Sequence, residues 1–275
     1  MSTTAVALLL ACLAAAAEMA GGALTVLHRR PSRALLLQLT GVAAGFILAT
    51  VLLDRVPMAV HDNANGGLWM LAGFMAIYLI ENLFSTHAHA HDHTAHVHVH
   101  DPPGMGHGHS LVSQFQAQDC LISPASAYAA FVGLALHTFL DGVAISAGFA
   151  ASPYTGFLMF LAVIFHKLPE GFSMASLMLA GGRGRRMALG SAVLLGMTTI
   201  LGALVALYAS AVRPAAAPGL LALATGSFLY IGASDLIPAT NAGDDRRAIW
   251  GVVLGVALYG LSGLVLHAFG LDHPH

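Results

Sequence analysis

Two short motifs in the sequence combine histidine with an acidic residue at the same spacing. His137 and Asp141 stand four residues apart in His-Thr-Phe-Leu-Asp-Gly, and His166 and Glu170 stand four apart in His-Lys-Leu-Pro-Glu-Gly. Residues at this spacing project from one face of a helix. Two imidazoles and two carboxylates suit Zn²⁺ and accept Fe²⁺, Mn²⁺, Co²⁺, Ni²⁺ or Cd²⁺, whereas the lack of thiolates argues against Cu(I). We therefore predict one four-ligand metal site, the alternative being side chains that only hydrogen-bond a neighbouring helix.

The composition indicates that the helices carrying these motifs lie in a membrane. Of the residues, 57% are hydrophobic and only 9% are charged, which is too few to give a soluble domain a polar surface. Eight apolar segments are long enough to span a bilayer, which takes ~20 residues. We therefore predict an all-α integral membrane bundle of eight transmembrane helices. The segments are Ala5 to Leu27, Ala34 to Leu53, Leu68 to Phe84, Pro124 to Ala151, Tyr154 to Ala180, Met187 to Val212, Leu220 to Pro238 and Ala248 to Leu271.

An internal repeat divides these helices into groups of three, two and three. Gly45-Phe46-Ile47-Leu48 is followed by Asp54 and Pro57, and Gly226-Ser227-Phe228-Leu229 is followed at the same spacings by Asp235 and Pro238. The second and seventh helices run in opposite directions, so we predict an inverted repeat, an arrangement typical of transporters. The expected regions are helices 1–3 (1–84), a His-rich loop (85–123), helices 4–5 with the metal site (124–180) and helices 6–8 (181–275).

The basic residues predict the orientation, because cytoplasmic loops of membrane proteins are enriched in arginine and lysine. We place Arg55 and Arg213 on one side of the membrane and Lys167 inside the fifth helix. Both termini are then extracytoplasmic, and we expect a multi-pass protein of the cell (cytoplasmic) membrane. The other eight basic residues share the opposite side: Arg29, Arg30, Arg33, Arg183, Arg185, Arg186, Arg246 and Arg247.

The loop between the third and fourth helices holds nine of the sixteen histidines. Prolines and glycines interrupt it, so we expect it to be disordered, cytoplasmic and able to bind metal weakly, since neutral imidazole is a good ligand. The alternative is a polar linker that transport does not need. The histidines are His87, His89, His91, His93, His96, His98, His100, His107 and His109.

Taken together, these features resemble the ZRT/IRT-like (ZIP) family of metal transporters. The resemblance covers eight spans, the His-rich loop, the two His/acid motifs and the segment Phe-Leu-Tyr-Ile-Gly-Ala-Ser-Asp-Leu-Ile-Pro at 228–238. It implies that His137, Asp141, His166 and Glu170 form the transport site and that metal moves into the cytoplasm. It also implies that helices 1, 4, 5 and 6 move against helices 2, 3, 7 and 8. The metal ion is then the substrate, and no cofactor is required.

The sequence departs from the two-metal version of this family's pattern. Thr138 stands where asparagine often follows the first histidine, Lys167 stands where a further ligand can follow the second, and the sixth helix offers no carboxylate. We expect a single ion, with Lys167 as a local counter-charge rather than a side chain reaching outward. Two carboxylates already neutralise one divalent ion, so the lysine should leave a net positive charge.

Other polar residues carry weaker predictions. Asp54 and Asp235 are either entry and exit carboxylates or interhelical hydrogen-bond partners, whereas the intramembrane Glu18 and Glu81 have no spacing that assigns a role. The alternative functions are a membrane-embedded zinc hydrolase, which would activate a metal-bound water, and a metal sensor or buffer. We expect no enzyme activity and no nucleic-acid partner at a net charge of -2, and we leave a homodimer open.

Overall fold

A computed structural model describes residues 2–27, 33–62, 64–89, 124–241 and 247–271 of the chain. Over these residues the chain is helical, and eight of its helices are long and apolar enough to cross a membrane, as predicted. Two spans change from α-helix to π-helix (η) and back. The elements are α1 Thr3–Val26, α2 Arg33–Thr50, η1 Val51–Arg55, α3 Val56–Asp62, α4 Gly66–His89, α5 Pro124–Ala151, α6 Pro153–Ala180, α7 Arg185–Val212, α8 Ala216–Tyr230, η3 Ile231–Leu236, α9 Ile237–Asn241 and α10 Arg247–Ala268.

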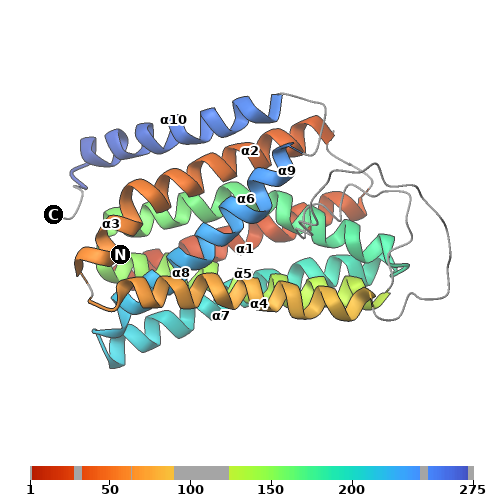
Figure 1. Cartoon of the computed structure of the whole chain (residues 1–275), viewed down its shortest axis with the longest axis horizontal. Helices are drawn as coiled ribbons and strands as arrows, with labels where there is room; N and C mark the ends of the chain where they lie inside the picture. The colour runs from red at the N-terminus through yellow and green to blue at the C-terminus, as the bar shows by residue number, and fades with distance from the viewer. Residues whose placement is uncertain (1, 28–32, 63, 90–123, 242–246, 272–275) are drawn as a thin grey trace.

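The helices lie side by side in one bundle, with α5 and α6 packed against each other (Figure 1). The helix α1 packs on α6 and α7, and α5 also packs on α7. On the other side α2 packs on α10, and α4 on α8. Many outward-facing side chains are large and apolar; Trp250, for example, is 71% exposed. Such a surface is suited to lipid rather than water.

The inverted repeat predicted from the sequence is present in the backbone. The π-helical segment η1 contains Asp54 and η3 contains Asp235, so both repeats have the same irregularity at the same aspartate. Pro57 and Pro238 follow these aspartates, and a proline ring removes a donor and crowds the carbonyl four residues earlier, which loosens the helical ladder. The two spans begin at opposite ends of the bundle, α2 near the end of α1 and α8 near the end of α7 (Figure 1).

Three of the spans end later than the sequence predicted. The second span continues to Asp62 and the seventh to Asn241, because their prolines bend the helix instead of ending it. The helix α4 continues to His89, since no glycine or proline interrupts residues 85–89. The backbone of His87 and His89 is therefore helical. The other seven histidines predicted to bind metal in the loop lie outside the described residues.

Candidate metal centre

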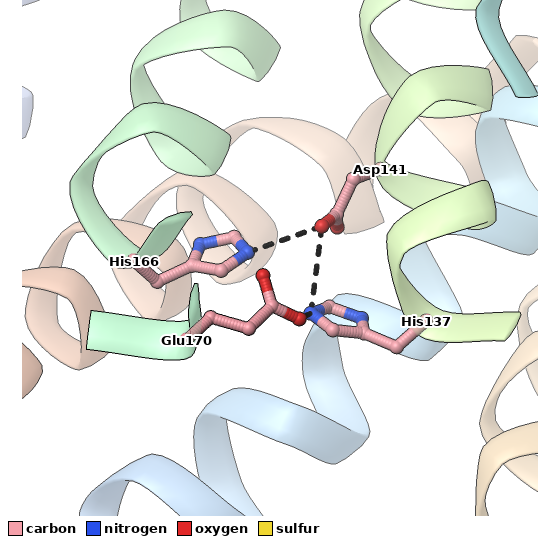
Figure 2. A group of neighbouring side chains, drawn as sticks. All are labelled: His137, Asp141, His166 and Glu170. Atoms are coloured by element: carbon pink, nitrogen blue, oxygen red, sulfur yellow. Dashed lines mark hydrogen bonds and ion pairs between the residues drawn. The ribbon is translucent and has the colours of Figure 1, made fainter. Parts of the chain in front are cut away.

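A tight reversal between α5 and α6 brings the two motifs face to face. The side chain of Ser152 caps α6, with its Oγ accepting a hydrogen bond from the Thr155 amide at 3.1 Å, and Pro153 occupies the first turn. Only Ser152 separates the two helices, so they run antiparallel from this turn. Each His/acid pair then faces the other across the α5–α6 interface (Figure 2).

The glycine that follows each acidic residue lets another helix approach the site. A Cβ on Gly142 would lie 1.9 Å from the Thr199 carbonyl oxygen of α7. A Cβ on Gly171 would lie 1.9 Å from the Glu18 carbonyl oxygen of α1. Only glycine permits such backbone contact, which is how membrane helices pack most closely. The Asp-Gly and Glu-Gly pairs therefore place a ligand and the helix contact that supports it side by side.

The four predicted ligands converge in one buried cluster. Ligand atoms of His137, Asp141, His166 and Glu170 all lie within 4.8 Å of one another. Asp141 Oδ2 is 3.3 Å from His166 Nε2 and 3.5 Å from His137 Nε2, and Glu170 Oε1 is 3.5 Å from His137 Nε2 (Figure 2). Their side chains are at most 7% exposed. The structure thus brings together the four side chains that the sequence paired only two by two.

These separations match those expected around a tetrahedral zinc ion. Bond lengths of about 2.0–2.2 Å to nitrogen and oxygen place neighbouring ligands about 3.3–3.6 Å apart. Three of the interatomic distances fall in this range, and a small contraction would bring in the rest. The Nδ1 of His166 lies 2.9 Å from the Ala162 carbonyl oxygen. A carbonyl only accepts, so Nδ1 carries the hydrogen and Nε2 is oriented as the ligand atom.

Lys167 is buried beside the cluster and does not reach outward. Its Nζ lies 2.7 Å from both Asp141 Oδ2 and Glu170 Oε2, and 3.3 Å from Glu18 Oε2, and the side chain is fully buried. The contacts agree with the counter-charge role. Glu18 is a third carboxylate near the lysine, which the charge prediction did not include, and the predicted net positive charge stays a prediction. The spacing of Glu18 in the sequence did not predict a role at this site. The sequence showed only that Glu18 is a carboxylate within a membrane span.

Thr138, the other residue predicted to modulate the site, faces α7. Its hydroxyl donates to the Ala135 carbonyl oxygen at 3.1 Å and contacts the hydroxyl of Thr198. The first contact lies within α5 and the second joins α5 to α7, and neither involves the four ligand atoms. A role for Thr138 at the metal stays a prediction.

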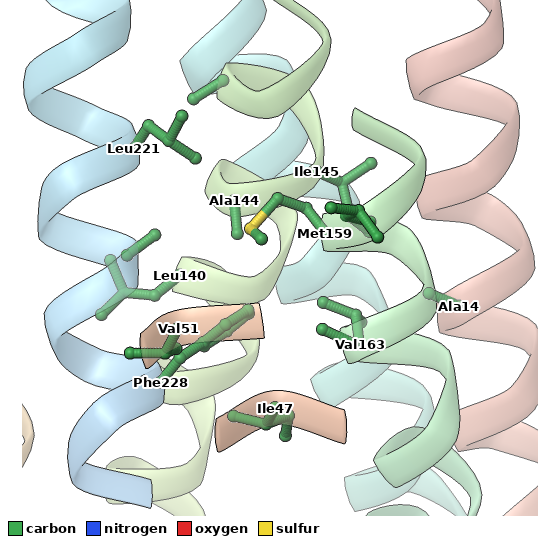
Figure 3. Close-up of a cluster of buried hydrophobic side chains, with 14 of the residues drawn as sticks. Ala14, Ile47, Val51, Leu140, Ala144, Ile145, Met159, Val163, Leu221 and Phe228 are labelled. Atoms are coloured by element: carbon green, nitrogen blue, oxygen red, sulfur yellow. The ribbon is translucent and has the colours of Figure 1, made fainter. Parts of the chain in front are cut away.

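A cavity of about 90 Å³ adjoins the cluster. A single water needs roughly 10–15 Å³ by this measure, so a hydrated ion fits. His137, His166 and Glu170 form its inner wall, and the lining continues toward the start of α5 and the end of α6. On the opposite side of the cluster, apolar side chains close the bundle (Figure 3). They include Ile47, Val51, Leu140, Ile145, Met159, Val163 and Phe228.

Comparison with known proteins decides the family. A family model described as "ZIP Zinc transporter" matches residues 2–263. The chain belongs to this family. It is thus a multi-pass membrane protein of a metal-ion transport family, as the motifs had suggested.

The similar proteins include both long and short members. Zinc transporter ZIP4 of Homo sapiens is 37% identical over 123 residues, which is 44% of this chain and 18% of ZIP4. Zinc transporter foi of Drosophila melanogaster is 29% identical over 166 residues, 55% of this chain and 23% of foi. The match to these two covers less than a quarter of their length. Zinc transporter ZupT of Salmonella paratyphi A is 27% identical over 274 residues, covering 97% of this chain and 99% of ZupT.

The two repeat aspartates have different surroundings. Asp235 lines the cavity together with Glu81, whose Oε2 accepts a hydrogen bond from the Tyr230 hydroxyl at 2.7 Å. Asp54 is instead paired at 2.7 Å with Arg55, which is buried within η1 rather than placed in a loop as predicted. Asp235 therefore lines the cavity, whereas Asp54 forms an ion pair with Arg55.

Proposed function

We propose that this chain transports zinc into the cytoplasm and that His137, Asp141, His166 and Glu170 bind one ion at a time between α5 and α6. The observation that supports it best is the convergence of four buried ligand atoms within 4.8 Å. Buried ionisable groups in a membrane helix are costly, about 2.5–3.5 kcal/mol each at the helix centre, so their clustering calls for a cation. The same donors would accept iron, manganese or cadmium.

The position of the cavity supports inward release. It extends from the ligands toward the end of the bundle that carries the exposed Arg185 and Arg186, the side that the positive-inside rule assigns to the cytoplasm. The apolar side chains on the other side exclude water and ions. This conformation would accordingly deliver an ion to the cytoplasm, with both termini outside.

The helix packing supports the two-part movement that the family resemblance implied. The helices α1, α5, α6 and α7 pack mainly on one another, and α2 with α10 and α4 with α8 form the remaining pairs. Sliding the first group would carry the site from one side of the apolar closure to the other. Asp235 would then serve the inner pathway and Asp54 the outer one, with η1 and η3 as the segments that adjust.

Zinc flux into sealed liposomes containing the purified protein tests this function. Single alanine variants of the four ligands should lose at least about 99% of the flux while still inserting and folding, since each removal leaves an uncompensated buried cluster. Ser191→Ala is the matched control, because Ser191 is a buried polar residue of α7 whose hydroxyl donates a hydrogen bond to the Ala188 carbonyl oxygen of the same helix. Wild-type flux from any two ligand variants would exclude the site. Hydrolysis without zinc flux would favour the alternative function, a membrane-embedded zinc hydrolase.

A further inference from the structure

Glu18 is the residue whose position the transport site does not yet explain. It lies in the middle of α1, is fully buried, and neither carboxylate oxygen has a hydrogen-bond partner within the described residues. The nearest cation is Lys167, at 3.3 Å from Oε2. A buried carboxylate with so little compensation is costly in a membrane, so it is retained only with a partner or a purpose.

The contact between Glu18 and Lys167 follows directly from the helix packing. Gly171 of α6 touches the backbone of Glu18 itself, and a Cβ on Gly21 of α1 would lie 2.2 Å from the Leu168 carbonyl oxygen. The two glycines bring α1 against the turn of α6 that carries Lys167 and Glu170. Glu18 therefore has a fixed position beside the site although it offers the metal no ligand atom.

The lysine contacts both acidic residues of the proposed metal site, and at Asp141 it contacts the same oxygen that faces the histidines. Its ammonium lies 2.7 Å from Asp141 Oδ2, the same atom that faces both histidines, and 2.7 Å from Glu170 Oε2. An ion bound to Asp141 Oδ2 at about 2 Å would stand within a few ångströms of that ammonium, and the two positive charges repel each other. This repulsion favours movement of the lysine away from Asp141 Oδ2 when the ion binds, and Glu18 is the adjacent carboxylate outside the ligand set, with oxygens that accept no hydrogen bond within the described residues.

We propose that Glu18 is a positioning residue that receives the Lys167 ammonium when a divalent ion displaces it from Asp141 and Glu170. The inference rests on the proposed transport site and deepens it. Three carboxylates and one ammonium carry a charge of -2, so one divalent ion makes the group neutral. A second divalent ion would leave a buried charge of +2, so the charge balance of the whole group favours a single ion.

Zinc uptake kinetics of the full chain in liposomes test the proposal. Glu18→Gln keeps the size of the side chain but removes its charge, so the displaced ammonium has no acceptor and KM should rise by ~10-fold or more. Glu18→Asp, which retains the charge, should stay closer to the wild type. In the double variant Glu18→Gln/Lys167→Met both charges are gone, and KM should return to within roughly threefold of the wild type.

Thr25→Val is the matched structural control. Thr25 also joins α1 to α6, through a hydrogen bond to the Phe172 carbonyl oxygen at 3.2 Å, but it lies away from the charges. Its variant should leave KM unchanged. An unchanged KM for Glu18→Gln, a double variant at least as impaired as the single one, or an equal effect of Thr25→Val would each overturn the proposal. If instead the wild type shows no flux, or His137→Ala transports normally, the proposed transport site itself fails.

Discussion

Gly171 provides a quantitative test of how the helices are held around the site. In Gly171→Ala the added Cβ would lie 1.9 Å from the Glu18 carbonyl oxygen, whereas real Cβ atoms essentially never approach closer than 3.0 Å. The difference is 1.1 Å, and the contacted oxygen belongs to the backbone of α1, so α1 must move away from α6 by at least about this amount. The movement lengthens the 3.3 Å contact between Glu18 and Lys167.

We expect this variant to fold with reduced stability and much reduced transport. Overpacking of this kind costs about 1–3 kcal/mol, and a displacement of about 1 Å near a site can lower the rate by up to ~100-fold. Zinc flux and thermal unfolding, measured on the same preparation, give both quantities. Gly190→Ala is the control, since within the described residues no other helix comes within 4 Å of a Cβ at that position. If Gly171→Ala behaved like Gly190→Ala, the close α1–α6 contact would be refuted.

Three further changes have distinct expected outcomes. Deleting residues 88–109 should lower the number of zinc ions bound per chain, measured by calorimetry, but keep most of the flux; an unchanged stoichiometry would show that the loop holds no metal. Lys167→Glu, especially with Thr138→Asn, should raise zinc affinity, admit a second ion and slow turnover, because two negative charges are gained; one bound ion at unchanged affinity would contradict this. Asp235→Asn should slow flux without lowering affinity at equilibrium, and equal flux would remove it from the pathway.

The sequence identified the four residues of the buried cluster because a spacing of four residues is a local property of a helix. It also predicted the repeat, since the aspartate and proline recur at fixed intervals. The predicted second helix ended before Pro57 and the seventh ended at Pro238, although a proline within a long apolar segment bends the helix when neighbouring helices can satisfy the freed carbonyl. The π-helical segments at both positions are the result.

The partner of Lys167 was beyond what the sequence could predict. Both faces of a membrane helix are apolar, so hydrophobic patterning does not show which face of α1 meets α6. That orientation depends on Gly21 and Gly171, whose meaning emerges only once the two helices are paired. The pairing adds Glu18 to the carboxylates near Lys167, which the sequence prediction of the site's charge did not include.

Anomalous diffraction from zinc-soaked crystals of the wild type tests the central claim most directly. We predict a single full-occupancy peak between α5 and α6, bonded at about 2.0–2.2 Å to Nε2 of His137, Nε2 of His166 and one oxygen each of Asp141 and Glu170. The Lys167 ammonium should lie closer to Glu18 than to Asp141 in that structure. No peak among these four residues, or two full-occupancy peaks between the same helices, would contradict the single-ion transport site.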